Sequence, residues 1–152
     1  MSTTTEDYQR YLLKKTIHLN VAHEYAQLSR ARRLKVGCVI VKDDRIISVG
    51  YNGTPAGRDN DCEYIEELPN GGQLKTKPEV LHAESNALMY ALREGVSTVG
   101  CELFTTHSPC YDCCKLIVSS GITIVYYDEE YRDTSGIDFL EECGITVLQK
   151  ED

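Results

Sequence analysis

The chain has 152 residues, 41% of them hydrophobic and 26% charged, a composition typical of one soluble globular domain rather than a disordered chain. Sixteen basic residues against 24 acidic ones give a net charge of −8, which disfavours binding to a polynucleotide. No apolar run is long enough to cross a bilayer, and Met1–Asp7 lacks the basic and apolar segments of a secretory signal. We therefore expect a cytoplasmic protein without a membrane partner.

The first half of the chain predicts a long helix, a hairpin and a loop. The helix is expected from Glu6 to about Arg32, and its apolar face recurs at helical intervals through Tyr8, Leu12, Leu19, Ala22 and Ala26. Two β-rich runs at 36–41 and 45–50 predict the hairpin. Tyr51 to about Glu79 is rich in Gly, Pro, Asn and charge, which predicts a long loop of the kind that is usually functional or disordered.

The second half predicts alternating helices and strands. The helices are expected at 82–94, at 108–121 with Ser108 as N-cap and Pro109 in the first turn, and at 136–142, and the strands at 101–106, 122–126 and 145–148. This alternation indicates a three-layer α/β sandwich and a single domain over 1–152.

Seven cysteines at 38, 62, 101, 110, 113, 114 and 143 form an odd set, and no secretion signal accompanies them. In a reducing compartment a Cys-x-x-Cys binds a metal or performs redox chemistry more often than it forms a disulfide. Cys110 and Cys113 would lie in the first turn of a helix, where the helix dipole favours thiolates. We expect Cys114 to face away into the core, Cys38, Cys101 and Cys143 to be core residues, and Cys62 to be a less favoured candidate for a second metal.

A His82-x-Glu84 segment at the start of another predicted helix accompanies the cysteine pair. One imidazole and two thiolates are three zinc ligands, and a tetrahedral site with three protein ligands leaves a position open for water. Glu84 would manage the protons of that water. The alternatives are a closed zinc site, a buried dithiol or a thioredoxin-like redox pair, with His107 as a rival ligand that would leave His82-x-Glu84 unexplained; we expect His107 in the pocket wall.

This His-x-Glu and Pro-Cys-x-x-Cys pattern is typical of zinc-dependent nucleobase deaminases. Together with the segments 36–41, 50–57, 82–87, 108–115 and 131–132, it resembles the deoxycytidylate (dCMP) deaminases of the cytidine deaminase-like superfamily along most of the chain. The resemblance implies a three-layer α/β/α sandwich with a central mixed five-stranded sheet. It also implies hydrolytic deamination of dCMP to dUMP and ammonia, which supplies dUMP for thymidylate synthesis, with one catalytic Zn²⁺ held by His82, Cys110 and Cys113 and with Glu84 as proton shuttle.

The resemblance also implies substrate contacts at Asn52, Arg33, Tyr131, Arg132, Ala83 and Ser108. Family members are typically hexamers that dCTP, with Mg²⁺ bound to the triphosphate, activates and dTTP inhibits, so Tyr51, Asn52 and Gly53 are candidate effector residues. From the residues alone, Tyr51-Asn52-Gly53 is equally typical of a turn, and Arg33 and Arg132 of solvated surface. The alternative functions are deamination of another cytosine or purine substrate, including a nucleoside or a tRNA, and a non-catalytic zinc-binding module.

Overall fold

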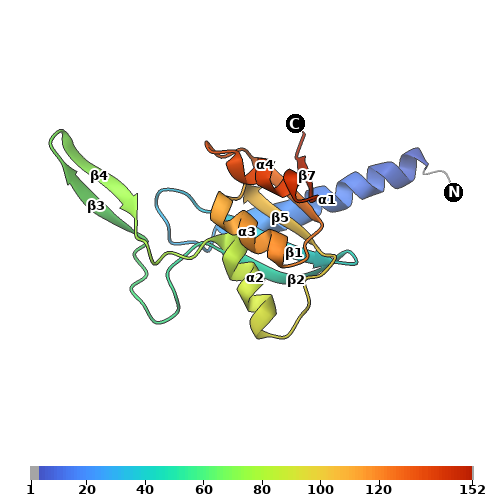
Figure 1. The fold of residues 1–152 in the computed structure, drawn as a ribbon, viewed down its shortest axis with the longest axis horizontal. Helices are drawn as coiled ribbons and strands as arrows, with labels where there is room; N and C mark the ends of the chain where they lie inside the picture. Colours follow the sequence, from blue (N-terminus) through green and yellow to red (C-terminus); the bar gives the residue numbers. More distant parts are fainter. Residues whose placement is uncertain (1–3, 152) are drawn as a thin grey trace.

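The computed structural model describes residues 4–151 and contains a mixed sheet covered by helices on both faces (Figure 1). The strands run in the order β2-β1-β5-β6-β7, where β1 (Gly37–Lys42) pairs antiparallel with both β2 (Arg45–Tyr51) and β5 (Glu102–His107). β6 (Ile124–Glu129) pairs parallel with β5 and with β7 (Thr146–Gln149). The predicted three-layer sandwich with a central mixed five-stranded sheet is confirmed.

Each face of the sheet has its own hydrophobic core. Helix α1 (Thr5–Ala26) packs Leu19 and Ala22 against Val39 and Phe104 on one face. On the other face lie α2 (Ala83–Arg93), α3 (Tyr111–Ser119) and α4 (Ser135–Glu142). Within residues 4–151, no helix combines the length and apolar character that a membrane span requires.

Two glycines let the helices approach the sheet. A Cβ on Gly37 of β1 would overlap the Ala22 carbonyl oxygen of α1. A Cβ on Gly50 of β2 would overlap the Ala83 carbonyl oxygen and lie 2.7 Å from the Ala87 nitrogen of α2. The first turn of α2 therefore lies directly on the backbone of β2, a spacing that only glycine permits.

Helix α1 begins within one residue of its predicted start, but its packing at that end and the position of its last residue differ from the prediction. Its first turns extend beyond the sheet (Figure 1), so that Tyr8 and Leu12 are exposed instead of packing on it. The helix ends at Ala26 and not near Arg32, because the Ser29 hydroxyl donates to the Asn52 carbonyl at 2.8 Å and accepts from the Ala31 backbone N–H at 3.2 Å. Serine side chains that bond neighbouring backbone in this way compete with helix continuation.

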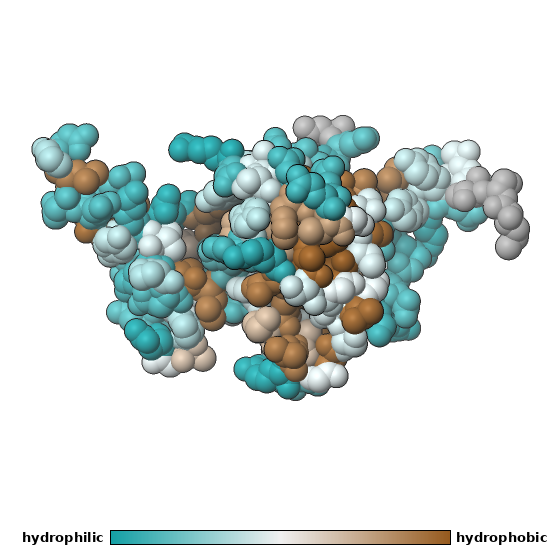
Figure 2. Space-filling view, viewed as in Figure 1, coloured by the Kyte–Doolittle hydropathy of each residue, from teal (hydrophilic) through white to brown (hydrophobic). Residues whose placement is uncertain are grey.

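The predicted loop from Tyr51 to Glu79 is wrong in its middle, which forms an antiparallel hairpin of β3 (Glu63–Leu68) and β4 (Gly71–Thr76). This hairpin is a separate two-stranded sheet that projects from the body (Figure 1). Most of its surface is hydrophilic (Figure 2), so it has no buried apolar face whose alternation a sequence pattern could reveal. The turn residues Pro69-Asn70-Gly71-Gly72 were the available signal.

Two smaller expectations also fail. Cys110 and not Ser108 is the N-cap of α3, because Ser108 and Pro109 are still part of the buried connection from β5. Cys143 is exposed because it follows the last turn of α4 and does not belong to a strand, whereas Cys38 and Cys101 are buried as expected.

His18 of α1 generates a prediction about stability. Its ring packs on Phe104 with centroids 5.1 Å apart, and neither ring nitrogen has a hydrogen-bond partner among the described residues. Burial lowers the pKa of His18 below 6.5, with Asp44 and Glu102 opposing this shift and Lys15 and Lys14 adding to it. The unfolded chain therefore takes up a proton at higher pH than the folded chain, and the free energy of unfolding falls as the pH drops below about 6.5.

Replacing His18 by leucine is expected to weaken this pH dependence, since leucine cannot take up a proton in the unfolded chain. Urea unfolding of both proteins at about pH 7.5 and about pH 5.5 would measure it. If the free energy of unfolding fell by the same amount between the two pH values in the wild type and in His18→Leu, the prediction would be contradicted.

Candidate active site

Helices α2 and α3 begin beside each other, and their N-cap residues are His82 and Cys110. Both residues have extended backbone, and neither side chain caps its own helix. Instead, His82 Nδ1 lies 3.2 Å from Cys113 Sγ and 3.4 Å from Cys110 Sγ. The three side chains can offer ligand atoms that all lie within 4.8 Å of one another, so they can share one metal ion.

The two thiols of this cluster differ in how readily they lose a proton. The Cys113 thiol donates a hydrogen bond to Cys110 and His82 adds another, which lowers the pKa of Cys110 to about 4 despite its partial burial. The same hydrogen bond and burial raise the pKa of Cys113, and the bond to Cys110 raises the pKa of His82. Zinc binds thiolates and neutral imidazole, so these donors fit zinc, and binding would release the protons that the cluster shares.

The other cysteine and histidine candidates lie outside this cluster. Cys114 is fully buried, and its Sγ lies 3.7 Å from the Pro109 carbonyl oxygen. His107 Nδ1 is 2.8 Å from Thr106 Oγ1, and its Nε2 is 3.0 Å from Glu129 Oε2. The expectations that Cys114 is a core residue and that His107 lies in the pocket wall are confirmed.

Glu84 occupies the first turn of α2 and is only 4% exposed. The Thr105 hydroxyl donates to its Oε1 at 2.8 Å. Burial raises the pKa of Glu84, and the hydrogen bond from Thr105 partly opposes this shift. A carboxyl group with a raised pKa holds a proton more readily near neutral pH, as a proton shuttle requires.

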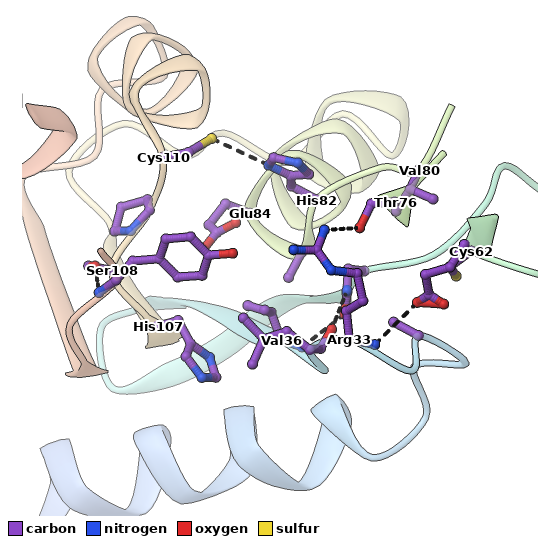
Figure 3. A pocket seen from close by; sticks show the side chains of 17 residues that line it. Arg33, Val36, Cys62, Thr76, Val80, His82, Glu84, His107, Ser108 and Cys110 are labelled. Carbon is purple, nitrogen blue, oxygen red and sulfur yellow. Dashed lines mark hydrogen bonds between the residues drawn. The ribbon is translucent and has the colours of Figure 1, made fainter. Parts of the chain in front are cut away.

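A cavity of about 320 Å³ opens over the cluster, and His82, Glu84 and Cys110 form part of its wall (Figure 3). Of the six residues predicted to contact substrate, five line it: Arg33, Asn52, Ala83, Ser108 and Tyr131. Arg132 is exposed and does not line it. The wall also includes Cys62, Glu63 and Thr76, which sequence reasoning missed because they lie at the base of the unpredicted hairpin.

Arg33 lies on the side of the cavity nearest the hairpin. Figure 3 shows its guanidinium pointing toward Thr76, and its Nη1 donates to Thr76 Oγ1 at 3.1 Å. The segment carrying Arg33 is held by Glu63, a buried carboxylate that accepts from the backbone N–H of Arg32 at 2.7 Å and of Arg33 at 3.4 Å. Glu63 therefore joins the hairpin to the segment that presents Arg33.

Asn52 fastens the chain where it enters β1. Its Oδ1 accepts from the Val36 backbone N–H and its Nδ2 donates to the Leu34 carbonyl, both at 2.8 Å. Gly53 pairs with Leu81, directly before His82.

A second cavity of about 340 Å³ adjoins this turn and is lined by Tyr51, Asn52 and Gly53 among others. The two cavities share Asn52 and Cys62.

Two comparisons of sequence agree with this site. The family described as "cytidine and deoxycytidylate deaminase zinc-binding region" matches residues 13–129. The ComE operon protein 2 of Bacillus subtilis is 38% identical over 135 residues, covering 86% of this chain and 67% of that protein. The deoxycytidylate deaminase of Enterobacteria phage T4 is 34% identical over 175 residues, covering 90% of this chain and 89% of the phage enzyme.

The fold has a close counterpart among solved structures. The dCMP deaminase of cyanophage S-TIM5, in complex with dCMP and dUMP, superposes with a TM-score of 0.78 at 41% identity. The match covers 98% of this chain and all of that one. Because the family match spans well over half of the chain and includes His82, Glu84, Cys110 and Cys113, this protein belongs to the cytidine and deoxycytidylate deaminase family.

Proposed function

We propose that this protein is a zinc-dependent dCMP deaminase that converts dCMP and water to dUMP and ammonia, and thereby supplies dUMP for thymidylate synthesis. The observation that carries the proposal is a single cavity lined by His82 and Cys110 of the donor cluster, by the buried Glu84 carboxylate and by Arg33. The dCMP and dUMP complex of the 41% identical cyanophage enzyme supports the choice of nucleotide.

His82, Cys110 and Cys113 would hold one zinc ion per chain. A zinc ion held by these residues would supply an activated water as the nucleophile. Glu84 accepts a first proton from the attacking water on its carboxylate and delivers it to the cytosine ring nitrogen. It then takes the second proton from the oxygen now bound to the ring carbon and passes it to the amino group, which leaves as ammonia. Because Glu84 is 4% exposed, bulk water does not compete for that proton.

The remaining wall residues would orient the nucleotide. Arg33, which lines the cavity, would bind the phosphate, since a guanidinium makes paired hydrogen bonds to phosphate oxygens. Tyr131, Ser108, Ala83 and Asn52 would contact the sugar and base, and the Asn52 amide retains one N–H and one lone pair beyond its two backbone bonds. Arg132, next to Tyr131, would reach the phosphate from outside the present cavity wall.

Regulation, assembly and location belong to the same proposal. The second cavity beside Tyr51, Asn52 and Gly53 would bind an effector, dCTP with Mg²⁺ as activator or dTTP as inhibitor. Its shared wall with the first cavity supports this assignment, because an effector there contacts Asn52 directly. We further propose that residues 1–152 form one catalytic domain that assembles into a cytoplasmic homo-hexamer.

Zinc content is the first test. Cys113→Ala is expected to reduce bound zinc from about one ion per chain to nearly none, because two protein ligands hold zinc weakly. Cys114→Ala makes the same chemical change one residue further along α3, in the core, and should keep its zinc. Atomic absorption after dialysis would measure both, and equal zinc loss in the two variants would contradict the assignment of ligands.

Glu84→Gln separates proton transfer from metal binding. The amide has nearly the same shape as the carboxyl group but cannot shuttle a proton, so ammonia release should fall by about 10²- to 10⁴-fold while zinc content is unchanged. A variant that retains zinc and deaminates at the wild-type rate would contradict the role of Glu84.

Substrate choice is tested by ammonia release from dCMP, dCTP, deoxycytidine and cytidine. Arg33→Ala is expected to raise KM for dCMP by about 10-fold or more, because it removes charge-assisted hydrogen bonds to the phosphate, and to leave turnover of deoxycytidine unchanged. Preference of the wild type for an unphosphorylated nucleoside would overturn the choice of dCMP.

Regulation is tested by running the same assay with dCTP plus Mg²⁺, and with dTTP. Deamination rates that respond to neither effector would contradict the proposed effector site.

A further inference from the structure

The hydrogen bond between Thr105 and Glu84 joins the proposed proton shuttle to the centre of the sheet. Thr105 is fully buried, and its hydroxyl lies 2.8 Å from Glu84 Oε1. Among the described residues, no other side chain donates a hydrogen bond to the Glu84 carboxylate, whose further partner is its own backbone N–H. The direction of this carboxylate therefore depends on one neutral hydroxyl.

Thr105 is held more rigidly than a loop residue could be. It lies in β5, the middle strand of the five, and is paired with Cys38 of β1 on one side and Tyr127 of β6 on the other. Its β-branched side chain has few rotamers available in a strand. A hydroxyl fixed in this way defines a direction for Glu84 that the flexible glutamate side chain does not define for itself.

The hydroxyl also has a second partner, the His107 carbonyl oxygen at 3.0 Å. A hydroxyl has one hydrogen to donate and two lone pairs to accept with. Thr105 can therefore donate to a Glu84 carboxylate, or donate to His107 and accept from a protonated Glu84, without moving its oxygen. The contact with Oε1 is compatible with both forms of the acid, and Glu84 lines the cavity.

We propose that Thr105 is a positioning residue for the deamination reaction, which holds Glu84 Oε1 so that the other carboxylate oxygen is directed at the reacting atoms. Thr105 does not line the cavity and so does not bind substrate. Its effect acts through Glu84, in the chemical step and not in substrate affinity. The proposal rests on the deaminase function proposed above, but not on which nucleotide is the substrate.

The test compares Thr105→Val with Thr105→Ser. Valine has nearly the volume of threonine without the hydroxyl, and serine restores the hydroxyl without the methyl group. Thr105→Val is expected to lower kcat by about 10- to 100-fold, a part of what a positioned general base contributes, with KM changed less than about twofold and zinc content unchanged. Thr105→Ser should recover most of kcat.

Ser48→Ala is the matched control, because it also removes a buried hydroxyl that tethers α2. Ser48 of β2 is 4% exposed and donates to the Ala87 carbonyl at 2.6 Å, one turn along α2 from Glu84. Its loss should lower the thermal midpoint while kcat stays within about twofold of the wild type. If Ser48→Ala lost as much kcat as Thr105→Val, a general loosening of α2 would explain both and the proposal would fail.

Three further results would overturn the proposal. The first two are an unchanged kcat in Thr105→Val and a loss of activity that appears in KM alone. A Thr105→Ser variant that folds and binds zinc but stays as slow as Thr105→Val would also overturn it. The wild type separates this proposal from the proposed function, since absence of turnover on every cytosine and purine substrate would refute the function without any variant.

Discussion

The close approach of two helix N-termini determines the chemistry of this protein. At each end the N-cap side chain, His82 or Cys110, turns away from its own helix and toward the other. Both helices thus give up a side-chain cap, each typically worth about 1 kcal/mol. As a result, the N-termini of two helices, with their unpaired N–H groups and positive dipole ends, meet at one site. There they stabilise the negative charge of thiolates.

The sheet makes this approach possible, and the sequence shows how. Gly50 lets the first turn of α2 lie on the backbone of β2, while the Pro109 connection carries β5 directly into α3. Helices α3 and α4 also pack closely where Gly136 of α4 meets Cys114 of α3. A Cβ on Gly136 would lie only 2.8 Å from Cys114 Sγ. Cys114 is therefore fixed in the core by α4, which keeps its neighbour Cys113 facing His82.

The sequence predicted the elements that depend on interactions between residues close together in the chain. Strands with buried faces, helix stops at glycine and the spacing of His82, Glu84, Cys110 and Cys113 are all visible along the chain, and the structure places them as expected. The β3–β4 hairpin was missed because it buries almost no apolar surface. Glu63 was missed together with the hairpin that carries it. Thr105 was missed for another reason, since its bond to Glu84 joins residues 21 positions apart and no local pattern encodes it.

The two sides of the cavity differ in stability, because only one of them is built from the hairpin. The metal side belongs to α2, α3 and the central strands, which are packed in a continuous core. The opposite side, which we propose binds the nucleotide, includes Glu63 and Thr76 and is where Arg33 bonds to both of them. Glu63 and Thr76 belong to a two-stranded ribbon that has no core of its own. Exchange of this ribbon in evolution or by design can therefore reshape the binding wall while the reacting groups stay in place.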